Sequence, residues 1–217
     1  MSQPDFSKLS LQDGLRNNLD SLGYHAMTPI QAGSLPLILD GKDVIGQGKT
    51  GSGKTAAFAL GILQKLQTRL FEVQALILCP TRELADQVAG EVRRLARGLP
   101  SVKVLTLCGG TPVGPQASSL KHGAHIIVGT PGRVDDHLRK GSLDLQSLTT
   151  LVLDEADRML EMGFQDTLDR IVAEVPGKRQ ALLFSATFPE AIEAIATRIL
   201  NKPERVTVAS THDNAVI

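Results

Sequence analysis

Residues 48–55 form the glycine-rich segment Gly48-Lys49-Thr50-Gly51-Ser52-Gly53-Lys54-Thr55. It follows the apolar pair Val44-Ile45 and precedes an alanine-rich segment with a helical pattern. Glycines allow backbone N–H groups to turn inward around an anion, and the start of a helix adds its positive dipole end. The pattern in this context predicts a phosphate-binding loop at one edge of a sheet. A flexible turn that only caps a helix is the alternative.

The loop and a later acidic pair together predict a site for a nucleoside triphosphate with Mg²⁺. Lys54 is expected to reach the β- and γ-phosphates, and the Thr55 hydroxyl to ligate the metal. Asp154 and Glu155 directly follow the apolar residues 151–153, so a buried strand is expected to deliver both carboxylates to the same edge. Asp154 suits a Mg²⁺ contact, direct or through water, and Glu155 can orient and deprotonate the attacking water. A solvated acidic turn is the alternative, but the pairing favours hydrolysis over binding alone.

Apolar segments alternate with helical stretches from residue 43 onward. The expected strands are residues 44–45, 76–79, 104–107, 126–128, 151–153, 181–184 and 205–208. Strands separated by helices favour right-handed crossovers, and hence an α/β fold whose mostly parallel sheet carries helices on both faces. Ligands of such sheets bind beyond the carboxyl ends of the strands, where every motif named here is expected to lie.

We predict three parts of the chain. Residues 1–42 are expected to form a preface of helices, with leucines from Leu9 to Leu22 in a helical pattern and Thr28-Pro29 starting a second helix that runs to Leu39. Residues 43–208 are the nucleotide-binding α/β domain. Residues 209–217 are polar and irregular, and are expected to begin a linker.

The composition limits the partners and the compartment. The 217 residues carry 23 Lys and Arg against 23 Asp and Glu, so any nucleic-acid contact has to be local. The cluster Arg93, Arg94 and Arg97 is either such a contact or a solvated helix face. Cys79 and Cys108 end apolar segments and are expected to be buried free thiols, which suits a reducing cytoplasm. No apolar segment reaches the roughly 18 residues of a membrane span, and the start of the sequence lacks a signal region. We expect a cytoplasmic protein without membrane contact.

Further motifs follow one another along the chain: Pro80-Thr81-Arg82-Glu83-Leu84, Gly109-Gly110, Thr130-Pro131-Gly132-Arg133, Asp154-Glu155-Ala156-Asp157 and Phe184-Ser185-Ala186-Thr187. With the phosphate-binding loop, they resemble the first RecA-like domain of the DEAD-box RNA helicases, and the resemblance covers residues 6 to about 208. The sequence around the motifs is most similar to the bacterial DbpA-like subgroup, which acts on 23S ribosomal RNA during large-subunit assembly.

The resemblance implies an ATP-dependent RNA helicase with a role in ribosome biogenesis. Ser185 and Thr187 would couple the nucleotide to the RNA side, and Asp157 would contact both of them and a second RecA-like domain in the same chain. The backbone of one RNA strand would be held by Thr81, Arg82, Gly110, Thr130, Gly132 and Arg133. Ordinary roles as helix caps, turns or solvated side chains stay open for these residues. An RNA clamp that does not unwind, and a phosphate-loop enzyme acting on DNA or a small phosphate acceptor, are the rival functions.

The preface carries a further resemblance. Residues 23–31, with Phe6 upstream, are similar to the adenine-reading Q motif of the family. The Gln31 amide offers an acceptor and two donors that suit the edge of adenine, and Tyr24 can stack on the ring. Thr28 completes the predicted base-binding residues. Two positions depart from the family pattern, since Met27 replaces a frequent proline and Gly48 a frequent alanine, but neither removes a ligand.

Overall fold

The structure is a computed structural model that describes residues 4–208, and these form one seven-stranded sheet with the strand order β3-β4-β2-β5-β6-β1-β7. The strands are β1 (Val44–Gln47), β2 (Ala75–Leu78), β3 (Val104–Leu107), β4 (Ile126–Gly129), β5 (Thr150–Leu153), β6 (Gln180–Ser185) and β7 (Glu204–Thr207). Every neighbouring pair is parallel. The predicted α/β fold is confirmed. Strand ends shift by one or two residues, so that Cys79 and Val208 lie just beyond β2 and β7.

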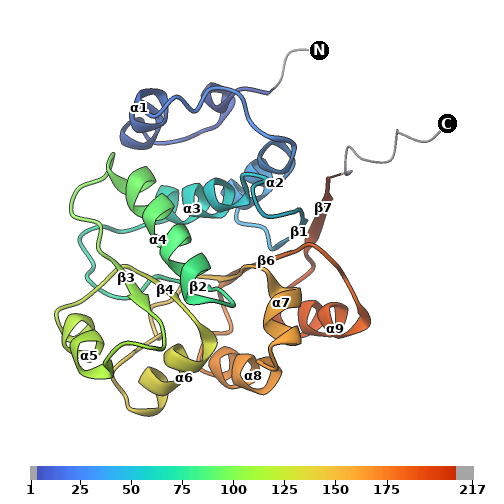
Figure 1. Cartoon of the computed structure of the whole chain (residues 1–217). Coiled ribbons are helices and arrows are strands. Elements are labelled where there is room, and N and C mark those ends of the chain that lie inside the picture. The colour runs from blue at the N-terminus through green and yellow to red at the C-terminus, as the bar shows by residue number, and fades with distance from the viewer. Residues whose placement is uncertain (1–3, 209–217) are drawn as a thin grey trace.

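Helices cover both faces of the sheet (Figure 1). The short 3-10 helix η1 (Phe6–Lys8) and the helices α1 (Asp13–Ser21), α2 (Pro29–Leu39), α3 (Lys54–Lys65) and α4 (Arg82–Ala96) lie on one side. The other side carries α5 (Val113–Lys121), α6 (Pro131–Arg139), α7 (Ala156–Glu161), α8 (Gln165–Ala173) and α9 (Glu190–Ile199). The predicted preface helices are present, and α2 has the predicted bounds. Residues 209–217, predicted to begin a linker, lie outside the described residues.

Two apolar clusters, one on each face, hold these layers together. Alternate residues of β2 serve different clusters: Ile77 packs with Phe58 of α3, while Leu76 and Leu78 pack with the cluster that includes Met159 of α7. Side chains of successive strand residues point to opposite faces, so a strand buried on both sides has to be apolar throughout. Each fully buried aliphatic side chain contributes about 1.5–3 kcal/mol. The continuous apolar segments of the sequence are therefore the central strands.

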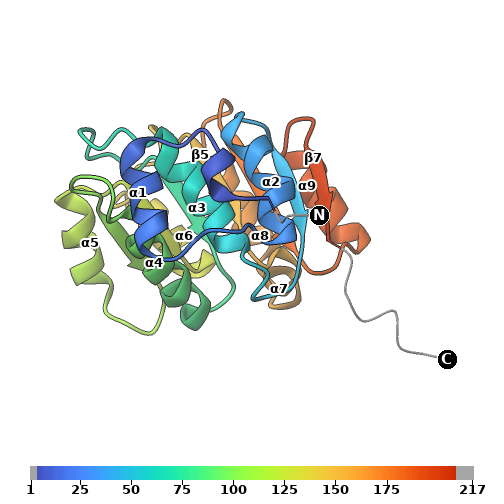
Figure 2. The same cartoon turned by 90° about the horizontal axis from the view of Figure 1, so that it is seen from above.

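The preface packs directly on the nucleotide-binding domain (Figure 2). Its helix α1 starts at Asp13, later than the leucine pattern predicts, because the backbone is still extended at Gln12, with φ −63° and ψ 152°. The backbone N–H of Gln12 donates to the Gln64 side chain of α3 at 2.8 Å. Leu9 precedes the helix and is nevertheless buried. At the end of α4, a Cβ on Gly14 would lie 2.2 Å from the carbonyl oxygen of Gly98. Only glycine allows the two backbones to approach so closely.

Candidate nucleotide and RNA site

Six strands deliver the predicted motifs to one edge of the sheet. The phosphate-binding loop follows β1, and residues 80–82 follow β2. The glycine pair follows β3, residues 130–133 follow β4, the acidic motif follows β5, and Thr187 follows β6. Because the strands are parallel, their carboxyl ends share this edge, which is where open α/β sheets bind ligands. The structure thus brings the predicted nucleotide and RNA residues together at a common edge.

The phosphate-binding loop has the backbone that its glycines suggest. Gly51 and Gly53 have φ angles of 84° and 88°, in the left-handed region, and Gly53 is the N-cap of α3. The carbonyl oxygen of Gly53 accepts a hydrogen bond from Nε2 of Gln31 at 3.0 Å. A Cβ on Gly53 would lie 2.5 Å from that nitrogen. The loop and the Q-motif glutamine therefore form one unit, and residue 53 has to be glycine. The remaining loop residues are Gly48, Lys49, Thr50 and Ser52, beside the half-buried Thr55.

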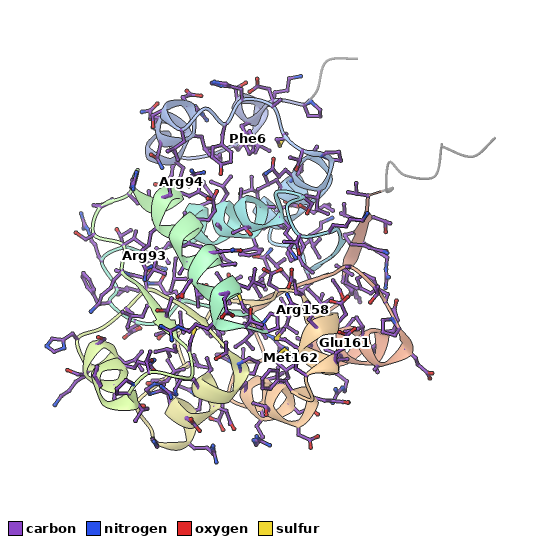
Figure 3. The ribbon with its side chains drawn as sticks, in the orientation of Figure 1. Phe6, Arg93, Arg94, Arg158, Glu161 and Met162 are labelled. Carbon is purple, nitrogen blue, oxygen red and sulfur yellow. The ribbon has the colours of Figure 1, made fainter. Side chains whose placement is uncertain are left out.

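Lys54 lies against both predicted carboxylates. Its Nζ is 2.9 Å from Oδ1 of Asp154 and 3.7 Å from Oε1 of Glu155, and its side chain is only 5% exposed. Glu155 also accepts hydrogen bonds from Oγ1 of Thr50 at 2.5 Å and from Nη1 of Arg158 at 2.7 Å. Arg158, labelled in Figure 3 on α7, was not predicted, although its position three residues after Glu155 on a helix places the two side chains together.

The two carboxylates differ in their protonation equilibria. Burial raises the pKa of Asp154 above its ordinary value, although Lys54 opposes the shift. Burial also opposes ionisation of Glu155, but the hydrogen bond from Thr50, the charge of Lys54 and the hydrogen bond from Arg158 outweigh it and lower its pKa. Glu155 is therefore ionised at neutral pH. Its backbone is left-handed, with φ and ψ both 52°, a conformation that costs a residue other than glycine about 1–2 kcal/mol.

The surroundings of Asp154 fit a Mg²⁺ ion. Its side chain is fully buried, and Oδ2 has no hydrogen-bond partner. A buried carboxylate oxygen without a partner is an available ligand for a hard cation or for one of its waters. Within residues 4–208 no three His, Cys, Asp or Glu side chains cluster as metal ligands.

Two of the predicted base-binding residues, Tyr24 and Gln31, line one cavity of about 330 Å³ beside the phosphate-binding loop, whereas Thr28 does not line it. Oε1 of Gln31 accepts from the backbone N–H of Thr28 at 2.9 Å, as part of a capping box at the start of α2. Each polar atom of the Gln31 amide keeps one further hydrogen-bonding position. Tyr24 lies in the same cavity, with Phe6 edge-on to its ring at a centroid distance of 5.7 Å.

The wall of this cavity includes α4 residues that the sequence analysis missed. Gln87 and Glu91 line it, and Glu91 accepts a hydrogen bond from the Tyr24 hydroxyl. The sequence does contain a pattern that could have indicated these residues. Leu84, Gln87 and Glu91 are spaced by three and four positions and therefore share one face of a helix. The same hydroxyl accepts from Nη2 of Arg94 at 2.9 Å.

The predicted coupling residues contact one another. Oδ2 of Asp157 accepts from both the backbone N–H and the hydroxyl of Thr187, at 3.2 and 2.9 Å. Ser185 accepts from the backbone N–H of Asp157 at 3.2 Å and donates to the Thr187 carbonyl at 2.8 Å. These bonds join the end of β6 to the start of α7. A displacement of the acidic motif would therefore reach the segment after β6.

The predicted RNA residues surround the ends of β2, β3 and β4. Thr81 caps α4 by accepting from the backbone N–H of Leu84, and Arg82 is exposed beside the loop of Gly110, whose φ is 84°. Thr130 is the N-cap of α6 but makes no side-chain cap bond. Thr130, Gly132 and Arg133 line a shared cavity of about 450 Å³. Thr81 therefore does have the alternative role as a helix cap. The Thr130 hydroxyl does not cap its helix.

The arginine cluster of α4 lies elsewhere. Figure 3 shows Arg93 and Arg94 towards the end of α4 that adjoins α1, and Nη2 of Arg93 donates to the carbonyl of Val104, the first residue of β3. That end of β3 is opposite to the motif-bearing edge. Arg94 supports Tyr24, so the contacts of both arginines are structural ones. Cys79 and Cys108 are buried free thiols, as predicted.

Comparison with known proteins identifies the family. Residues 28–195 match the model of the DEAD/DEAH box helicase family, and the chain belongs to that family. The ATP-dependent RNA helicase DbpA of Escherichia coli K12 is 62% identical over 89% of this chain. The DEAD-box ATP-dependent RNA helicase CshA of Geobacillus kaustophilus is 47% identical over 94% of it. A crystal structure of a DEAD box protein from Methanococcus jannaschii, 37% identical, superimposes with a TM-score of 0.90 over 94% of this chain.

The matched regions are parts of longer proteins. The chain covers 42% of DbpA, 43% of CshA and 56% of the Methanococcus jannaschii chain. It thus spans less than half the length of the curated relatives named above. None of the helices in residues 4–208 is long and apolar enough to cross a membrane.

Proposed function

We propose that this chain is the N-terminal ATPase domain of a cytoplasmic, ATP-dependent RNA helicase that opens short RNA duplexes during ribosome assembly. The observation that carries the proposal is the arrangement of Lys54, Asp154 and Glu155 at the edge where the RNA-facing motifs also lie. The relatives named above are RNA helicases by name. The motif surroundings, which resemble the subgroup that acts on 23S ribosomal RNA, favour a ribosomal target.

Each residue of the nucleotide site has a defined task in this proposal. Lys54 exchanges its contact with Asp154 for the β- and γ-phosphates, and the Gln31 amide binds the edge of adenine with its remaining donor and acceptor. Mg²⁺, held by Thr55 and by Asp154 partly through water, would neutralise phosphate charge. Glu155, ionised and fixed by Thr50, orients the attacking water and takes up its proton.

The RNA side is reached through the hydrogen bonds of Asp157. Movement of the acidic motif on nucleotide binding displaces Ser185 and Thr187, which couple the nucleotide to the RNA side. Asp157 itself contacts the second RecA-like domain. Thr81, Arg82, Gly110, Thr130, Gly132 and Arg133 hold the phosphates and sugars of one strand. Such contacts position the strand without reading its sequence.

Turnover needs a second RecA-like domain in the same protein. The relatives are more than twice as long as the matched region, which leaves room for that domain. An arginine that reaches the γ-phosphate in the transition state accelerates phosphoryl transfer by roughly 10³- to 10⁵-fold. Residues 1–217 alone are therefore expected to bind adenine nucleotides and to hydrolyse ATP scarcely above background. We refer below to a protein in which a second RecA-like domain follows these residues as the two-domain protein.

Strand displacement tests the proposal. ATP hydrolysis and duplex opening are measured with the two-domain protein and with residues 1–217, on matched RNA and DNA duplexes, with Glu155→Gln as the inactive control. The two-domain protein should show RNA-stimulated hydrolysis and open the RNA duplex, and the shorter chain should do neither. RNA-stimulated hydrolysis without displacement would favour the RNA clamp. A preference for DNA, or full turnover by residues 1–217 alone, would contradict the proposal.

A further inference from the structure

One side-chain amide connects the loop after β3 to two residues of α6. Gln116, in the first half of α5, donates through Nε2 to the carbonyl of Cys108 at 3.1 Å and to Oγ1 of Thr111 at 3.0 Å. Its Oε1 lies 3.1 Å from Nη1 of Arg133 and 2.9 Å from Nε2 of His137. An amide has two donors and two acceptor positions, so these contacts use all of them. Gln116 is thus fully engaged between two segments to which RNA residues belong.

The orientation of this amide is determined by its partners. The Cys108 carbonyl can only accept, so Nε2 of Gln116 has to face it, and Oε1 has to face Arg133 and His137. His137 then donates through its Nε2, and its Nδ1 accepts from Oγ of Ser142 at 2.6 Å. The His137 ring is completely buried, and burial together with the Arg133 charge lowers its pKa. The neutral ring holds Gln116 from the side away from the loop.

These contacts fix the Arg133 side chain but do not occupy all of its hydrogen-bond donors. Its Nη1 is shared between Oε1 of Gln116 and the carbonyl of Thr111, at 3.1 and 2.8 Å, and its Nε lies 3.7 Å from a carboxylate oxygen of Asp136. Among the hydrogen bonds of residues 4–208, none uses Nη2 of Arg133. A guanidinium fixed on one side keeps donors for a phosphate on the other.

We propose that Gln116 is a positioning residue for the RNA backbone, which sets Arg133 relative to the glycine-pair loop, and that His137 holds Gln116 in place. The inference rests on the proposed function, because it requires Arg133 to contact RNA. Neither Gln116 nor His137 touches the nucleotide cavity. Loss of Gln116 should therefore weaken RNA binding while leaving ATP binding intact.

The test compares four forms of the two-domain protein: wild type, Gln116→Met, Arg133→Ala and the double variant. Methionine keeps the length of the side chain and removes its hydrogen bonds, and a thermal melt verifies folding. Gln116→Met should raise the KM for RNA several-fold, with unchanged ATP affinity and unchanged kcat at saturating RNA. The double variant should be no worse than Arg133→Ala, because residues that act through one contact are not additive. Gln116→Glu, which keeps both acceptor contacts, should retain more RNA affinity than Gln116→Met.

The matched control is Gln146→Ala, an exposed glutamine whose side chain makes no hydrogen bond within the described residues; its RNA KM should equal that of wild type. An unchanged RNA KM in Gln116→Met, together with a raised RNA KM in Arg133→Ala, would overturn the inference about Gln116 but not the proposed contact of Arg133 with RNA. Multiplying effects in the double variant would also overturn it. An unchanged RNA KM in Arg133→Ala would instead reject the proposed contact of Arg133 with RNA, and with it the role of Gln116.

Discussion

Replacing Lys54 by alanine should destabilise the nucleotide-free protein as well as weaken nucleotide binding. Asp154 is fully buried, and Lys54 at 2.9 Å is the cation that compensates it. Removing one partner of a buried ion pair typically costs about 3–5 kcal/mol. We expect the lower end, about 3 kcal/mol, because Glu155 keeps its bonds to Thr50 and Arg158. For a chain of this size that loss lowers the Tm by roughly 6–12 °C.

The loss of stability in Lys54→Ala should depend on pH. The pKa of Asp154 is already raised in the folded wild type, and it rises further when Lys54 is absent. In the unfolded chain the pKa of an Asp side chain is about 4. At pH values between this pKa and the higher pKa of Asp154 in the folded variant, the folded variant binds more protons than the unfolded chain. Its free energy of unfolding therefore falls as the pH increases between these two pKa values. Protonated Asp154 needs no cation. The difference between wild type and Lys54→Ala should therefore be larger at pH 8 than at pH 5.

Urea unfolding of the nucleotide-free chain measures both effects. The variants are Lys54→Ala, Asp154→Asn and the double variant, at the two pH values. In the Asp154→Asn background, Lys54→Ala should cost much less, because no buried charge is left without a partner. Lys49→Ala, an exposed lysine in the same loop, should change stability by less than about 0.5 kcal/mol. Equal stability of wild type and Lys54→Ala at pH 8, or a loss that does not vary with pH, would refute the argument.

Further predictions concern turnover, base reading and the loop. Glu155→Gln in the two-domain protein should keep the Kd for ATP and lower kcat by roughly 10²- to 10⁴-fold; a wild-type kcat would remove Glu155 from catalysis. Calorimetry should show tighter binding of ADP than of GDP and a smaller preference in Gln31→Ala, and equal affinities in the wild type would contradict the adenine contact. Gly53→Ala should weaken ADP binding more than Gly51→Ala, since both residues have positive φ but only the Cβ at 53 would strike Gln31, at 2.5 Å. Similar losses in the two variants would contradict this.

The sequence predicted the elements because each central strand is a short, wholly apolar segment. Residues 151–153 had to be buried on both sides, and the acids after them therefore had to lie at the sheet edge. The late start of α1 was not predictable in this way, because Gln12 has an extended backbone and its N–H donates to Gln64 of a different helix. Local periodicity contains no information about such a partner.

The same limit applies to the site. Residues of the phosphate-binding loop, the acidic motif and the RNA motifs are recognisable because they are close in sequence and their chemistry requires particular side chains. Gln116 and His137 are 21 positions apart, and neither belongs to a pattern. Their contact joins the first half of α5 to the last turn of α6. The left-handed backbone of Glu155 was equally hidden, since local sequence favours that conformation at glycine.

The close approach of Gly14 and Gly98 shows that residues 4–42 are not a separate part added in front of the nucleotide-binding domain. Together with the contact between Gly61 and Ile38, where an added Cβ would lie 2.2 Å away, it shows that the first helices fit the domain as closely as its own core residues do. A shorter chain that began at residue 43 would expose to water the apolar face of α3 that α1 and α2 now cover. Exposed apolar surface of that kind promotes self-association. Such a chain should be recovered as aggregates, even though it would keep every residue from the phosphate-binding loop to Thr187.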